Sequence, residues 1–178
     1  MPSPTAQLMP PSATTVPADS FLGAYAAKGA FTDCYAASVP GSVSLSEFVL
    51  AFYTTPLFKV ERWLLAKLLR MASSDQQARQ LADADTEQYS AWKVEQRSGT
   101  EILMDAGQTR SWLSVQPLAE TGTSTTLLFG SAVVPMRPGG KFGVPFHALL
   151  GFHRLYSRLL LSSAAKRVLA LRRTARAG

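Results

Sequence analysis

Apolar and polar residues alternate from Phe31 to Val39, and Pro40 with Gly41 closes this stretch as a turn would. A period of two places successive side chains on opposite faces of an extended chain. The pattern therefore predicts a first β-strand over Phe31–Val39.

Three helix starts follow this strand. Ser44 and Glu47 form a capping-box pair, in which the Ser hydroxyl and the Glu carboxylate bond each other's backbone amides. Ser74 with Gln77 repeats the arrangement, and Pro56 suits a first helical position because that position needs no N–H donor. We therefore expect helices over Phe48–Tyr53, from Pro56 to about Met71, and over Gln76–Ala84.

Four short segments with strand-like composition come next, separated by turns that contain Gly. They are Tyr89–Arg97, Glu101–Asp105, Arg110–Pro117 and Thr125–Val134. Their spacing is typical of an antiparallel meander, so we expect five strands in all.

The segment Pro145–Arg173 has a helical period and no internal proline. Projected at 100° per residue, one set of residues falls within about 80° of arc, and the arginines gather on the other side. That set is Phe146, Leu149, His153, Tyr156, Leu160, Ala164 and Leu171. A curved antiparallel sheet wrapped around this long C-terminal helix buries both apolar faces, so the predicted class is α+β with the helices on one side of the sheet.

Residues 1–20 contain five prolines and no charge before Asp19, so they lack the basic and apolar regions of a secretory signal. We expect them to form a disordered tail and residues 21–178 to form one domain. The chain is 47% hydrophobic and 17% charged, and it has a single cysteine, which excludes zinc-ribbon and disulfide scaffolds. These features favour a cytoplasmic protein, either free or peripheral to a membrane.

The C-terminal part of the chain resembles a known superfamily. Residues 145–150 (PFHALL) and 152–158 (FHRLYSR), with the preceding strand Leu127–Pro135, are similar to bacterial domains of unknown function in the START-like superfamily, also called SRPBCC. Members of that superfamily hold an apolar cavity between a curved sheet and a C-terminal helix. The resemblance implies a helix-grip fold, in which the curved sheet wraps around the C-terminal helix. It also implies a cavity that binds lipid-like or aromatic molecules, and it leaves the chemistry open.

His153 lies in the middle of the apolar helix face, between Leu149 and Tyr156. A neutral imidazole there would bond a ligand or act as a base, and the alternative is a core histidine bonded to a backbone carbonyl or a Tyr hydroxyl. Tyr156 has the same two interpretations, because its ring packs in a core while its hydroxyl seeks a partner.

Arg110 and Trp112 point to one side of their strand. If that side faces the interior, Arg110 anchors an acidic head group and Trp112 forms a cavity wall. If it faces outward, Arg110 and Asp105 form a surface ion pair worth at most about 1 kcal/mol. The sequence leaves both phases open.

Other chemistry finds little support. His147 and His153 are six residues apart, so one helix cannot present both to a metal ion. Cys34 could meet His153 only across the fold, and residues 138–141 (PGGK) match only part of a phosphate loop. No catalytic set, metal site or cofactor is predicted.

We therefore expect non-catalytic binding of a small apolar or amphipathic molecule between the sheet and the C-terminal helix. The predicted ligand-binding residues are His153, Tyr156, Arg110, Trp112, Phe146, Leu149 and Leu160. One alternative is a cyclase- or hydrolase-like enzyme with His153 as its base.

A second alternative rests on charge. Residues 121–178 hold nine basic and no acidic side chains, among them Arg172, Arg173 and Arg176. Such a helix suits an anionic membrane surface or a solvated face, whereas the absence of aromatic stacking residues on it disfavours nucleic acid.

Overall fold

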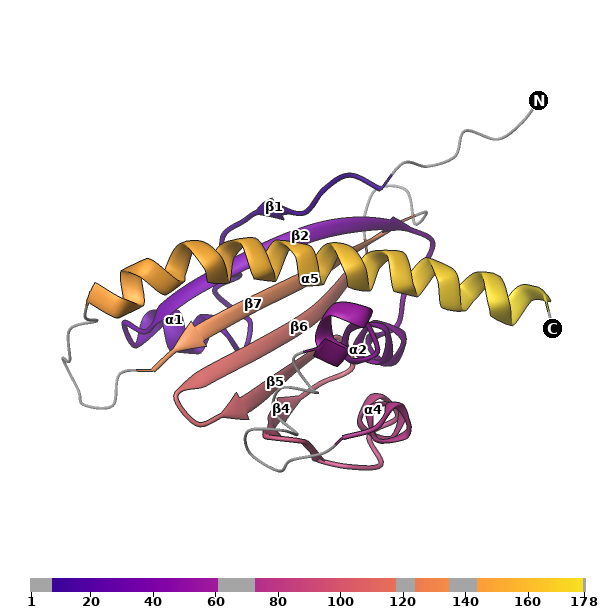
Figure 1. Cartoon of the computed structure of the whole chain (residues 1–178), viewed down its shortest axis with the longest axis horizontal. Coiled ribbons are helices and arrows are strands. Elements are labelled where there is room, and N and C mark those ends of the chain that lie inside the picture. The colour runs from indigo at the N-terminus through magenta and orange to yellow at the C-terminus, as the bar shows by residue number, and fades with distance from the viewer. Residues whose placement is uncertain (1–7, 61–72, 118–123, 135–143, 178) are drawn as a thin grey trace.

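The computed structural model describes residues 8–60, 73–117, 124–134 and 144–177, and within the last helix it describes the side chains of residues 153–175. Figure 1 shows a curved sheet with one long helix lying across it and shorter helices beside that helix. The class is α+β and the arrangement is helix-grip-like, as the sequence predicts.

The sheet has seven antiparallel strands among the described residues, in the order β1-β2-β7-β6-β5-β4-β3. The strands are β1 (Ser12–Ala13), β2 (Phe31–Pro40), β3 (Gln88–Tyr89), β4 (Trp92–Arg97), β5 (Glu101–Ala106), β6 (Thr109–Pro117) and β7 (Ser124–Val133). The expectation of five strands was wrong for two reasons. Ser90 takes a positive φ of 53° and divides the predicted strand Tyr89–Arg97 into β3 and β4, and β1 lies in the segment predicted to be disordered.

The helices are α1 (Gly23–Ala27), α2 (Leu45–Tyr53), α4 (Asp75–Ala82) and α5 (Val144–Ala177). Residues 56–60 are also helical, and the rest of the helix predicted to run to Met71 lies outside the described residues. Both predicted capping boxes are present: Ser44 and Glu47 bond reciprocally at the start of α2, and Ser74 and Gln77 do so at the start of α4.

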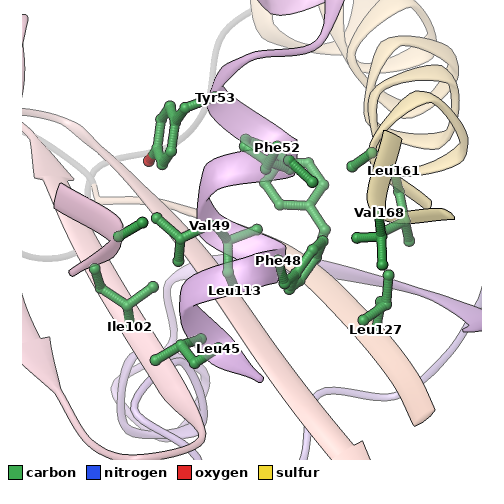
Figure 2. Close-up of a cluster of buried hydrophobic side chains, with 14 of the residues drawn as sticks. Leu45, Phe48, Val49, Phe52, Tyr53, Ile102, Leu113, Leu127, Leu161 and Val168 are labelled. Atoms are coloured by element: carbon green, nitrogen blue, oxygen red, sulfur yellow. The ribbon is translucent and has the colours of Figure 1, made fainter. Parts of the chain in front are cut away.

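The main core lies between the sheet, α2 and α5. In Figure 2, Phe48 and Phe52 of α2 point toward Leu161 and Val168 of α5. The ring of Phe52 lies 4.9 Å from that of Phe129 on β7, measured between centroids. This aromatic packing holds α2 against the sheet beside α5.

A second, smaller core covers the opposite face of the sheet. Trp112 and Cys34 are buried there beneath Leu22, with Val16 and Tyr25 packed against them. The backbone N–H of Thr14 donates to the carbonyl of Cys34, and Ser12 pairs with Ala36. The segment predicted to be a disordered tail is therefore ordered from residue 8 onward, and β1, Thr14 and Val16 contact the sheet.

Candidate functional site

A pocket of about 260 Å³ opens between α2, α5 and the adjoining parts of β5, β6 and β7. We call it the α5 pocket. Six aromatic side chains line it: Phe52, Tyr53, Phe58, Trp92, Phe129 and Tyr156. All of them except Tyr156 are buried, which makes the inner part of the pocket apolar.

Polar groups of the pocket come from α5, β6 and β7, and His153 of α5 and Ser131 of β7 form a hydrogen-bonded cluster with Asp33. Asp33 on β2 pairs directly with Ser131 on β7, so the register of two central strands brings their side chains together. The Ser131 hydroxyl donates to Asp33 Oδ1 at 2.6 Å and lies 2.9 Å from Nε2 of His153. His153 Nε2 also lies 3.4 Å from Asp33 Oδ2.

These three residues do not have the geometry of a nucleophilic triad. In a triad the carboxylate and the serine bond different nitrogens of the imidazole, and the serine proton passes to the histidine. Here the Ser131 proton is directed to Asp33, and both contacts use Nε2 of His153. The tautomer with a proton on Nε2 leaves Nδ1 as the acceptor, so the chemistry available to His153 is that of a hydrogen-bond acceptor or base.

The Asp33 carboxylate is stabilised in its charged form. Burial raises its pKa, but hydrogen bonds from His153 and Ser131 outweigh burial and hold the pKa below the ordinary value of 3.8. The Tyr35 hydroxyl donates to Asp33 Oδ2 at 3.4 Å, and burial together with this carboxylate raises the pKa of Tyr35. The Asp33 carboxylate therefore keeps its negative charge beside the imidazole of His153.

Ser157 also lines the α5 pocket, one helical turn after His153. It is fully buried, and its hydroxyl has no hydrogen-bond partner among the described residues. Leaving a buried hydroxyl unpaired costs about 1–3 kcal/mol. The Ser157 hydroxyl is therefore a buried polar group in the aromatic-lined pocket, open to a partner from outside the chain.

The structure brings four of the predicted ligand-binding residues to the α5 pocket. They are Arg110, His153, Tyr156 and Leu160. His153 is neither in a wholly apolar setting nor bonded to a backbone carbonyl, because its partners are a serine and a carboxylate. The side chains of Phe146 and Leu149 lie outside the described residues.

Trp112 and Arg110 lie on the side of β6 that faces away from the α5 pocket, which is the second of the two alternatives left open by the sequence. Trp112 is buried in the second core, across the sheet from the α5 pocket, where its Nε1 donates to Glu101 Oε2 at 2.6 Å. Arg110 borders the pocket, but its guanidinium bonds Asp105 Oδ1 at 2.8 Å, Glu95 Oε2 at 2.5 Å and the Tyr25 hydroxyl at 3.0 Å. Trp112 is thus no pocket wall, and the charge of Arg110 is already compensated by two carboxylates.

Sequence reasoning missed Asp33, Ser131 and Ser157. Two signals were present: Asp33 alternates in phase with Tyr35 on β2, and Ser157 lies four residues after His153 on the same helix face. The pairing of Asp33 with Ser131 had no local signal, because it joins strands far apart in sequence.

Comparison of the chain with protein-family models, curated proteins and solved structures finds no significant match. Within the described residues, no group of His, Cys, Asp and Glu is arranged to hold a metal ion. None of the helices in that same part of the chain has the length and apolar character needed to cross a bilayer.

Proposed function

We propose that the α5 pocket binds a small apolar or amphipathic molecule without transforming it. The observation that carries this proposal is an aromatic-lined space of about 260 Å³ between the sheet and α5. Known ligand pockets are likewise mostly apolar and carry a small number of polar groups. The resemblance to START-like domains points to the same class of function.

The volume limits the ligand. An apolar cavity of roughly 150 Å³ holds benzene, so the α5 pocket suits a molecule of one or two rings or a short acyl chain. Burying about 150–250 Å² of ligand surface at ~25 cal/mol per Å² yields about 4–6 kcal/mol. We therefore expect dissociation constants between about 1 mM and 40 µM for probes without polar contacts.

Native mass spectrometry of the purified protein, with solvent extraction of any bound molecule, tests the proposal. Leu160→Trp fills the pocket, whereas Leu159→Trp places the same ring at a position that is 52% exposed on the same helix. A bound mass present in the wild type and in Leu159→Trp, and absent in Leu160→Trp, is the expected result. Tyr156→Ala provides a second pocket variant if Leu160→Trp does not fold.

The opposite result is also well defined. If the wild type carries no bound mass, and none appears after incubation with small aromatic and acyl probes, the binding function is excluded. Equal loss of the bound mass in Leu159→Trp and Leu160→Trp would place the bound molecule elsewhere.

A second candidate function concerns the exposed side of α5. Leu155 and Leu159 are 58% and 52% exposed one turn apart, and the exposed Arg154 and Arg158 lie beside them. We propose that this face docks on an anionic bilayer. Each leucine contributes about 1.5–3 kcal/mol when buried, and each basic residue about 1 kcal/mol near an anionic surface.

The sequence points to a different part of α5, around Arg172, Arg173 and Arg176, as the surface for an anionic membrane. Arg172 is bonded to Glu47 and to the carbonyl of Ser42, so it is engaged within the fold, and the side chain of Arg176 lies outside the described residues. Cosedimentation with vesicles that contain phosphatidylglycerol should be lost in the double variant Leu155→Ser, Leu159→Ser and at high salt. Arg79→Ala, at an exposed position on α4, is the control. Binding that survives the double variant would refute docking through this face.

A further inference from the structure

The α5 pocket has a polar feature that the binding proposal leaves unused. Ser157 is 0% exposed and its hydroxyl has no hydrogen-bond partner in the part of the chain that the structure describes, yet it lies among the lining residues. Its neighbour His153 on the same helix face has a side chain that is 37% exposed. The pocket thus runs from a partly open end at His153 to a closed end at Ser157.

The charges around this pocket disfavour an acidic ligand. The charge of Arg110 is matched by Glu95 and Asp105, and the Asp33 carboxylate stands behind His153. No described lining residue therefore offers an uncompensated guanidinium or ammonium group to a carboxylate. A buried anion without such a partner is strongly disfavoured.

The aromatic walls and the unpaired hydroxyl of Ser157 together define a ligand class. We propose that the α5 pocket selects a neutral aromatic molecule that carries a hydroxyl group, such as a phenol, and that Ser157 bonds this hydroxyl. A hydroxyl suits Ser157 because each group both donates and accepts. The inference rests on the binding function proposed above and assigns its ligand chemistry.

Fluorescence titration with three matched probes tests the inference: naphthalene, 2-naphthol and 2-naphthoate. One hydrogen bond contributes about 0.5–1.5 kcal/mol, so 2-naphthol should bind about 2- to 12-fold more tightly than naphthalene. The anionic 2-naphthoate should bind more weakly than 2-naphthol. In Ser157→Ala the ratio of naphthol to naphthalene affinity should fall to about 1 or below, because the naphthol hydroxyl loses its partner, with naphthalene affinity retained.

A matched control lies on the same helix. Ser163 is half-buried and lies outside the pocket lining, so Ser163→Ala should leave the probe ratio unchanged. Ser157→Ala should also raise the melting temperature of the ligand-free protein by about 2–4 °C or more, because it removes an unpaired buried hydroxyl. A structural serine with a hidden partner would lower that temperature instead.

The outcomes separate the two proposals. Equal affinity of the wild type for naphthalene and 2-naphthol, or a naphthol preference that persists in Ser157→Ala, overturns the role of Ser157 and leaves the binding pocket intact. Failure of all three probes to bind overturns the proposed ligand class, and the binding function falls with it if the acyl probes fail as well.

Discussion

The guanidinium of Arg172 forms two parallel hydrogen bonds with the carboxylate of Glu47, Nε to Oε1 at 2.9 Å and Nη2 to Oε2 at 3.0 Å. Glu47 is also the third residue of α2 and the capping-box partner of Ser44. One carboxylate therefore caps α2 and ties it to the C-terminal part of α5. This tie lies at the opposite end of α2 from the residues that line the α5 pocket, Phe52 and Tyr53.

Separating the charge of Glu47 from its capping role gives the first prediction. Glu47→Gln keeps a side-chain acceptor for the capping box but removes the ion pair. Because the Glu47 side chain is 42% exposed, we expect the pair to contribute only about 1 kcal/mol. A double-mutant cycle with Arg172→Met in urea unfolding measures this coupling, and a coupling near zero would show that the pair is fully screened.

Asp33 gives a pH-dependent prediction. Its pKa in the folded protein lies below the ordinary value of 3.8, so its charged form stabilises the fold above that pH, and this contribution is lost as the pH falls through the lowered value. Asp33→Asn should cost about 1–3 kcal/mol at pH 7, because a hydrogen-bonded charge is lost. The difference in stability between the two proteins should shrink as the pH falls below 3.8.

Urea unfolding between pH 7 and pH 3 checks this, with Asp85→Asn at an exposed position as the control. The lowered pKa of Glu47, held by Arg172, contributes to the acid transition of both proteins, so the difference between variant and wild type is the informative quantity. A stability difference that stays constant with pH would contradict the charged role of Asp33.

Gly130 on β7 gives a packing prediction. A Cβ atom there would lie 2.4 Å from Leu22 Cδ2 and 2.8 Å from the carbonyl oxygen of Asp33. Gly130→Ala should therefore destabilise the protein by about 1–3 kcal/mol or more, which lowers the melting temperature by several degrees. Gly99→Ala is the control, because an added Cβ meets nothing within 4 Å there. Equal melting temperatures for both variants would contradict the close packing of Leu22 on the sheet.

Trp112 separates the two faces of the sheet. Trp112→Phe removes the hydrogen bond to Glu101 and part of the packing in the second core. It should cost about 1–3 kcal/mol of stability. Its effect on 2-naphthol affinity should stay below about twofold, since the α5 pocket lies on the other face. Loss of ligand binding in a folded Trp112→Phe protein would instead return this residue to the pocket.

The elements set by local signals were predictable. The capping pair Ser44 and Glu47 placed the start of α2, and the period-two pattern after Phe31 placed β2. Short-range hydrogen bonding and side-chain periodicity determine such elements, so neighbouring residues carry the information. The long C-terminal helix followed for the same reason.

The arrangement of the site depended on information that local patterns lack. The pairing of Asp33 with Ser131 is a register between strands 98 residues apart, and the phase of β6 decides which face Arg110 and Trp112 occupy. Residues around Leu22 pack in the second core, on the face of the sheet opposite the α5 pocket. The sequence did not indicate this packing, because these residues follow a proline-rich segment. Each of these features depends on tertiary contacts between segments far apart in sequence, which the local composition does not indicate.

Intermolecular nuclear Overhauser effects from bound 2-naphthol to the methyl groups of leucine locate the ligand most directly. Leu160 lines the α5 pocket, whereas the equally buried Leu103 lies in the core on the other face of the sheet. We predict cross-peaks from the naphthol ring to Leu160 and to the ring of Tyr156, and none to Leu103. Cross-peaks to Leu103 alone, or to neither leucine at saturating 2-naphthol, would contradict a binding site between the sheet and α5.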